Sequence, residues 1–327
     1  MENTRRFCVR VAECRWILPL LFAAGLAFCV IAESGGLLNS YTRFALTTMA
    51  VNVILCASLN LVNGYLGEFS VGHAGFMALG AYASAMLTTR LFPQMPALFI
   101  PAILAGGLVA AGIGFLLALL SFKTRGDYLA IITLAFLMIV KSALENIPWV
   151  GGPRGLAGIP TLTTLPVAFV AAAATLWTIR NLVFSKFGRA VVAIREDEIA
   201  ANAMGVRTRE AKILAFSVSS FFGGVAGALL AHQITFINPG SFDIIKSTEI
   251  LVMVYLGGIG SLAGSVLGAV IFTLLSEALR EFGTWRMVIL PLILVLLMLF
   301  RPRGIMGLKE LPWFLPRREL ATRRKKS

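Results

Sequence analysis

The run ALFIPAILAGGLVAAGIGFLLALLS, residues 97–121, contains no charged side chain. A helix of about 20 apolar residues is long enough to cross a hydrocarbon layer of roughly 30 Å. Similar runs recur along the 327-residue chain, in which 58% of the residues are hydrophobic and 14% are charged. Soluble domains carry roughly 25% charged residues. The sequence therefore predicts an all-α, polytopic membrane protein and excludes a water-soluble fold.

Working outward from this run, hydropathy and loop charge predict about ten transmembrane helices. Their approximate boundaries are 16–33, 43–62, 73–91, 97–121, 127–147, 164–183, 213–236, 244–258, 262–280 and 285–300. This divides the chain into an N-terminal tail (1–15), a transmembrane domain (16–300) and a basic C-terminal tail (301–327). The first apolar run also resembles a signal peptide ending near Ala32. We favour an uncleaved span, because Trp16 stands where an interfacial anchor belongs.

The net charge of +13 comes from basic residues in short loops and at both termini. Such residues mark loops that are retained in the cytoplasm. Both tails and the loops containing Lys123 and Lys186 are therefore predicted to be cytoplasmic, which indicates an inner-membrane protein. Three crossings after the outer loop at Asn238 satisfy this orientation if a turn at 257–261 lies near the cytoplasmic face. Nucleic-acid binding is excluded, because no soluble domain exists to present the charge.

The sequence contains no phosphate-binding GxxxxGK[ST] motif, and HExxH and GxSxG are also absent. Its two histidines lie far apart, and its four cysteines form no CxxC pair. The sequence therefore predicts no catalytic residue, no metal site and no cofactor, so we expect a protein that is not an enzyme.

The longest polar interruption is SKFGRAVVAIREDEIAANAMGVRTREAK, residues 185–212. Residues Arg195 to Met204 are predicted to form one short helix along the membrane surface. Its acidic first turn suits the helix dipole, and Gly205 suits a left-handed terminating residue. Such a helix could dock on a separate motor protein, or it could be a solvated loop without a partner.

Polar side chains inside membrane segments are costly and often line a transport path. The closely spaced glycines of GEFSVGHAGFMALGAY, residues 67–82, indicate an irregular or broken helix, which could hold a substrate or form a gate. The alternative is that the glycines permit close packing and the polar groups bond to neighbouring helices. The candidates for the path or gate are Asn60, Asn63, Glu68, Ser70, His73 and Glu249.

Other patterns predict packing. Lys141 and Glu145 lie one helical turn apart and are expected to neutralise each other. The glycines at four-residue spacing allow helices to approach closely, and they are Gly223, Gly227, Gly260, Gly264 and Gly268. The triplet YLG followed by LGA occurs at 65–81 and again at 255–269, which suggests either an internal duplication or chance similarity of glycine-rich helices.

Several ordered motifs resemble one family, the LivM-type permeases of high-affinity branched-chain amino acid ABC importers. They include FSVGHAGFMALGAY (69–82), GGPRGLAGIP (151–160), the cytoplasmic signature GRxxxxxRxxExAAxxxG beginning at Gly188, AFSVSSFFGGVAGALLA (215–231) and MVYLGGIGSLAGSVLGA (253–269). The similarity covers roughly residues 59–307.

The resemblance implies an ABC importer permease fold and a subunit that carries branched-chain or related amino acids into the cytoplasm. The implied partners are a second homologous permease, two cytoplasmic ABC ATPases, a periplasmic amino-acid-binding protein and the lipid bilayer. It also implies that 185–212 contacts the ATPase through Arg189, Arg195, Glu198, Ala200, Ala201 and Gly205. The alternatives are an ion-coupled secondary transporter, the same importer type carrying urea or amides, and a structural scaffold.

Overall fold

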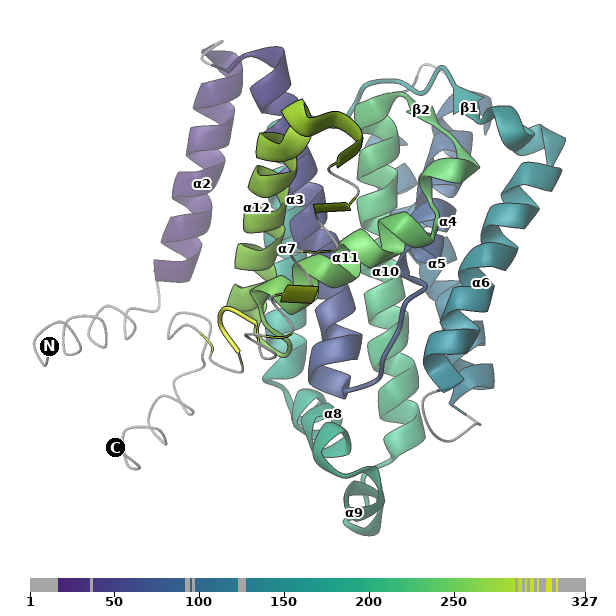
Figure 1. Ribbon diagram of the computed structural model, residues 1–327, viewed down its shortest axis with the longest axis vertical. Helices are drawn as coiled ribbons and strands as arrows, with labels where there is room; N and C mark the ends of the chain where they lie inside the picture. The colour runs from purple at the N-terminus through teal and green to yellow at the C-terminus, as the bar shows by residue number, and fades with distance from the viewer. Residues whose placement is uncertain are drawn as a thin grey trace, which may run out of the picture.

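The computed structural model describes residues 17–35, 38–91, 95, 98–122 and 128–285, and beyond them 288–289, 292, 295–296, 299, 304–307 and 310. These residues form a helical bundle, as the sequence predicts (Figure 1). Its longer helices are α2 (Ile17–Ser34), α3 (Ser40–Asn60), α4 (His73–Met86), α5 (Phe99–Ser121), α6 (Tyr128–Asn146), α7 (Leu165–Val183), α10 (Thr208–Ile234), α11 (Ile244–Gly257) and α12 (Leu262–Ala278).

The shorter elements lie between and after these helices. The π-helical turns Leu61–Leu66 and Leu87–Leu91 extend α3 and α4. Two short helices, α8 (Lys186–Glu196) and α9 (Glu198–Ala203), follow α7. The remaining elements are the strands β1 (Leu156–Ala157) and β2 (Phe236–Ile237) and the 3-10 segments Pro148–Val150, Gly152–Arg154, Pro239–Ser241 and Leu279–Trp285.

Six helices among the described residues are long and apolar enough to cross a membrane: Ser40–Leu66, Phe99–Ser121, Tyr128–Asn146, Leu165–Val183, Thr208–Ile234 and Leu262–Glu281. A shorter apolar stretch, Phe22–Glu33, lies in α2. The predicted number of about ten is therefore not confirmed. Helices α4 and α11 have 14 residues each, about 21 Å of helix at 1.5 Å per residue. The predicted segment 285–300 and both tails lie largely outside the described residues.

Helix α10 packs against α3, α4 and α5 in the middle of the bundle. Glycines allow these backbones to touch: a Cβ atom on Gly80 would overlap the backbone of Gly224. A Cβ atom on Gly227 would likewise overlap the carbonyl group of Met77 in α4. Small residues allow this close approach because no side chain separates the two helix backbones.

The two ends of the bundle differ. Helices α8 and α9 lie together at one end, which we call the α8–α9 end, and the strands lie at the opposite end, the β-strand end (Figure 1). There the Gly- and Pro-rich connection after α6 places Leu156 opposite Ile237 in a two-stranded antiparallel pair. Gly155 precedes this strand with a φ of +81°, a conformation that favours glycine.

The direct partner of Lys141 is not the expected Glu145, which acts on Lys141 only through a weaker electrostatic interaction. The Nζ atom of Lys141 lies 2.6 Å from Oδ2 of Asp243, and no bond between Lys141 and Glu145 occurs. Asp243 is the extended N-cap residue of α11 and accepts a hydrogen bond from the N–H group of Ile244. The bond to Lys141 lowers the pKa of the Asp243 carboxyl. A tertiary contact between α6 and α11 therefore replaces the expected local pair.

Candidate translocation and coupling site

The chain between α3 and α4 is irregular inside the bundle. The π-helical turn after α3 is ended by Gly67, whose φ is +80°, and residues 67–72 are non-helical until α4 begins at His73. The predicted interruption is confirmed for residues 67–72, whereas His73–Met86 is a regular helix. We call residues 67–72 the first break.

A second break, residues 258–261, separates α11 from α12, and Asn60 connects the end of α3 to it. The amide nitrogen of Asn60 donates to the carbonyl oxygen of Ser261 at 2.9 Å and to Oγ of Ser265 at 2.7 Å. Its amide oxygen accepts from the N–H group of Gly260 at 2.9 Å. Asn60 and Ser261 are fully buried. The end of α3 is thus joined by two hydrogen bonds to the second break and by one to the first turn of α12.

Side chains satisfy the free backbone groups of the first break. Asn63 accepts from the N–H group of Ser70 at 3.1 Å and donates to its carbonyl oxygen at 3.2 Å. The next peptide is held by Thr133, whose Oγ1 accepts from the N–H group of Val71 at 3.1 Å, and by Ser247, which donates to the carbonyl oxygen of Val71. Unpaired backbone groups cost several kcal/mol in a membrane, so these side chains stabilise the break.

The buried ring of His73 lies between α3 and α10. Its Nε2 atom is 2.8 Å from Oγ of Ser58, and Ser219 donates to the carbonyl oxygen of Ser58 at 2.6 Å. Gly223 leaves room for the ring, because a Cβ atom at this position would lie 3.1 Å from Nε2. His73, like Asn60 and Asn63, therefore bonds to neighbouring parts of the chain in this conformation.

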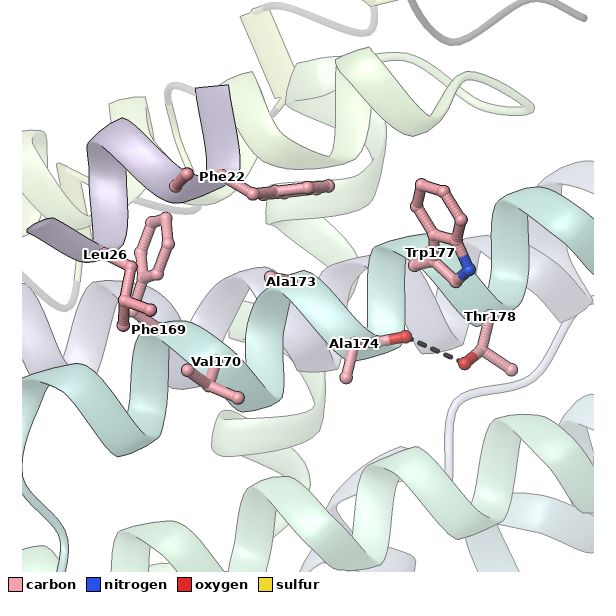
Figure 2. A pocket seen from close by; sticks show the side chains of 9 residues that line it. Phe22, Leu26, Phe169, Val170, Ala173, Ala174, Trp177 and Thr178 are labelled. Carbon is pink, nitrogen blue, oxygen red and sulfur yellow. Dashed lines mark hydrogen bonds between the residues drawn. The ribbon is translucent and has the colours of Figure 1, made fainter. Parts of the chain in front are cut away.

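An apolar pocket with a volume of about 390 Å³ lies between α2 and α7 (Figure 2). Phe22, Phe169 and Trp177 are among the residues that line it. The hydroxyl group of Thr178 donates to the carbonyl oxygen of Ala174 in its own helix at 2.8 Å. A pocket with so few free polar groups suits hydrocarbon better than a zwitterion, because a charged group would be desolvated without a partner.

The α8–α9 segment contains two helices, so the single predicted helix from Arg195 to Met204 is wrong. Asp197 is extended between them, and its carboxylate accepts from the N–H groups of Ile199 and Ala200 at 2.8 and 3.0 Å. This N-cap starts α9 as a new helix. At the other end Gly205 has a φ of +84°, which agrees with the predicted left-handed termination.

The α8–α9 segment contacts the first break directly. Arg195 donates to the carbonyl oxygen of Gly64 at 3.1 Å, and a Cβ atom on Gly67 would lie 2.6 Å from Cγ of Arg195. Lys212 in α10 bonds at 2.5 Å to the carboxylate of Glu68 and at 2.7 Å to that of Glu198. The irregular segment and the short helix are therefore joined through charged side chains.

The other candidate residues of this segment differ in exposure. Ala201 is buried, whereas Arg189, Ala200 and Gly205 are exposed. The sequence reasoning missed two neighbours, Ile199 and Met204, whose exposed fractions are 84% and 85%. Both are apolar residues within a polar segment, and that contrast was a signal available in the sequence.

Two glutamates lie elsewhere. Glu249 pairs with Lys246, one turn earlier in α11, at 3.0 Å, and does not join the groups around the breaks. Glu310 accepts from the hydroxyl group of Tyr65 at 2.7 Å and from the N–H group of Leu262. Burial raises the pKa of the Glu310 carboxyl. No sequence signal pointed to Glu310, because it lies in the tail beyond the last apolar run.

The region that contains both breaks and the α8–α9 segment also matches a known family. A family model described as "Branched-chain amino acid transport system / permease component" matches residues 41–300. The chain belongs to this family. As a LivM-type permease it is similar to the high-affinity branched-chain amino acid transport system permease protein LivM of Escherichia coli K12. The identity is 33% over 299 residues, which cover 80% of the permease and 68% of the relative.

Other relatives extend this comparison. LivM of Salmonella typhimurium LT2 is 33% identical over 321 residues, with 86% of the permease and 74% of the relative covered. The permease protein BraD of Pseudomonas aeruginosa is 25% identical over 293 residues, with 81% and 94% covered. No solved structure matches the chain. The family and the apolar helices together make this permease a multi-pass membrane protein.

Proposed function

We propose that this permease is the membrane subunit of an ATP-binding-cassette importer that moves branched-chain or related amino acids into the cytoplasm. It would pair with a second homologous permease in the inner membrane. Two cytoplasmic ATPases would supply the energy, and a periplasmic binding protein would deliver the substrate. The names of the relatives, which are permease proteins of amino acid transport systems, support this assignment. They give no support to an ion-coupled carrier that works alone.

The observation that carries the proposal is the exposed apolar surface of α9. Ile199 in α9 and Met204, the residue directly after this helix, are more than four-fifths exposed, and α9 lies beyond the end of the bundle (Figure 1). The α8–α9 segment lies in the loop 185–212, which its basic residues assign to the cytoplasm, so hydrocarbon would not cover α9. Exposed apolar side chains with polar neighbours are typical of protein–protein contacts. We infer that α9 is the element that docks on the ATPase.

The breaks are proposed to form the gate. Broken helices place backbone dipoles and polar side chains inside the bundle, as in many transporters. In the described conformation Asn63 and Ser70 bond to each other, and Asn60 bonds to the second break. His73 bonds to Ser58 of α3. Opening a path would require such bonds to change. Glu249 remains a weaker path candidate, because Lys246 already neutralises it.

The test begins with purification of the permease together with the subunits that co-elute with it, and with identification of those subunits. ATP-driven uptake by this complex is then measured. Ile199→Asp should weaken ATPase binding roughly tenfold or more, because buried apolar anchors dominate such interfaces. The matched control is Asn202→Asp, which adds the same charge to an exposed position of α9 without removing apolar surface. Unchanged ATPase retention and uptake in Ile199→Asp would contradict the docking assignment.

A second variant tests transmission through α9. Gly205 has open space around it but a left-handed backbone, so Gly205→Leu strains the helix end by roughly 1–2 kcal/mol. We expect the variant to hydrolyse ATP with reduced uptake. Wild-type uptake together with wild-type ATPase stimulation in this variant would count against the role of the segment.

A further inference from the structure

We propose that Lys212 is a positioning residue that transmits the movement of α9 to the first break. The inference rests on the proposed function and assigns a link within it. The ammonium group of Lys212 lies 2.5 Å from Oε1 of Glu68 in the first break and 2.7 Å from Oε2 of Glu198 in α9. The ring of Phe122, at the end of α5, lies 5.6 Å from the same nitrogen. One cation thus connects three elements that are distant in sequence.

Burial makes this link stiff. The Lys212 side chain is 9% exposed and that of Glu68 is 21% exposed, so water and salt screen the pair weakly. Charge-assisted hydrogen bonds of this length are among the stronger polar contacts in proteins. An isolated buried ammonium group is expensive, so Lys212 is expected to keep at least one carboxylate partner when the neighbouring elements move.

A second contact acts beside it. Arg195, at the end of α8, donates to the carbonyl oxygen of Gly64 and packs against Gly67. The α8–α9 segment therefore touches the chain on both sides of the point where the π-helical turn ends. A displacement of α9 must either carry Glu68 along through Lys212 or break one of the two carboxylate bonds of Lys212. The connection between the gate and the docking helix α9 can therefore exist in distinct arrangements, with the bonds of Lys212 intact or broken.

The same geometry changes the role of Glu68. The sequence suggested Glu68 as a candidate residue of the translocation path or gate. In the structure Lys212 already neutralises this carboxylate. Glu68 is therefore the receiving end of the link in this conformation and does not bind substrate there.

The experiment compares uptake per ATP hydrolysed in the complete complex, reconstituted in liposomes. Lys212→Met should lower this ratio roughly three- to thirtyfold, and Glu198→Gln should lower it in the same direction. The double variant should be no worse than Lys212→Met alone, because both changes remove the same connection. Lys212→Arg, which keeps the charge, should recover part of the ratio.

The matched control is Lys141→Met, which removes a similarly short lysine–carboxylate bond at the β-strand end. It should lower thermal stability and leave uptake per ATP unchanged, which separates loss of stability from loss of coupling. Glu198 is about half exposed, so Glu198→Gln should fold even if Lys212→Met does not.

Three outcomes would overturn the inference. Wild-type uptake per ATP in Lys212→Met or in Glu198→Gln would show that Lys212 does not transmit the movement of α9. An equal drop in Lys141→Met would show that the ratio reports general stability only. A wild-type complex that lacks ATP-driven uptake would instead refute the proposed function, and the link with it.

Discussion

Replacing Asn60 with alanine is the sharpest test of the connection between α3 and the second break. The side chain is fully buried and forms three hydrogen bonds, to the carbonyl oxygen of Ser261, to Oγ of Ser265 and from the N–H group of Gly260. Alanine removes all three. The hydroxyl group of Ser265 keeps a partner, since it also donates to Ser261 at 3.1 Å, but the N–H group of Gly260 loses its acceptor.

The magnitude follows from the number of bonds. A hydrogen bond between membrane helices contributes about 0.6 kcal/mol on average, and one in a soluble core contributes about 1 kcal/mol. Three such bonds, with the loss of the acceptor of Gly260, give a decrease of about 2–4 kcal/mol in the free energy of unfolding. Asn52 is the matched control, because it lies in the same helix, is 5% exposed and makes one bond, to Thr273 at 3.0 Å.

The measurement is equilibrium unfolding in mixed micelles, accompanied by uptake in reconstituted complexes. Asn60→Ala should be destabilised two to three times as much as Asn52→Ala, since the expected loss scales with the bonds removed. It should also lose uptake at temperatures at which the protein is still folded, because the second break is no longer fixed to α3. Equal destabilisation of the two variants, with equal uptake, would refute the reasoning.

Two further predictions concern packing and charge. Gly227→Leu should destabilise the bundle by about 1–3 kcal/mol, measured by thermal unfolding, because its side chain would overlap the backbone of α4; Gly112→Leu, at a position with open space, is the control and should have little effect. The bond from Lys141 holds the pKa of Asp243 below its ordinary value of 3.8. A carboxyl with a lowered folded-state pKa stabilises the fold above its unfolded pKa and loses this contribution as the pH falls through the folded value. The difference in melting temperature between wild type and Asp243→Asn should therefore stay constant from pH 7 to about pH 4 and shrink at lower pH.

Local chemistry made the elements predictable. Long apolar runs without charge predict helices, and the glycines between 67 and 82 predicted an interruption that the structure places at 67–72. Gly205 was predicted as a left-handed helix end because few other residues accept that conformation. The split at Asp197 was missed, although an aspartate before a short helix is a typical N-cap. The acidic residues 196–198 are compatible with the first turn of a single helix and equally with an N-cap between two helices.

Partner choice was not predictable, because it depends on tertiary distance. Lys141 has an acidic residue one turn away in sequence, yet it bonds to Asp243, which lies 102 positions away. Lys212 looked like the last charge of a loop, while its partner Glu68 is 144 positions away. Hydropathy and charge place such residues near a membrane boundary and give no information about which helix stands beside them. The predicted count of spans is not confirmed for a related reason, since a 14-residue helix inside a bundle has the same composition as part of a full crossing.

The two breaks behave as one unit on physical grounds. The repeated triplets lie where a helix meets a break: 65–67 ends with the first residue of the first break, and 255–257 ends α11 directly before the second. The ring of Phe69 in the first break packs edge-on against Tyr255, with 6.5 Å between the ring centroids. Ser247 of α11 donates a hydrogen bond to the carbonyl oxygen of Val71 in the first break, and Asn60 at the end of α3 bonds to the second break. A movement of the first break would therefore strain contacts with the second, so the breaks should shift together or remain closed together. Because Lys212 bonds to Glu68 in the first break, we expect the effect of α9 on α11 to pass through Phe69 and through the hydrogen bond from Ser247 to Val71.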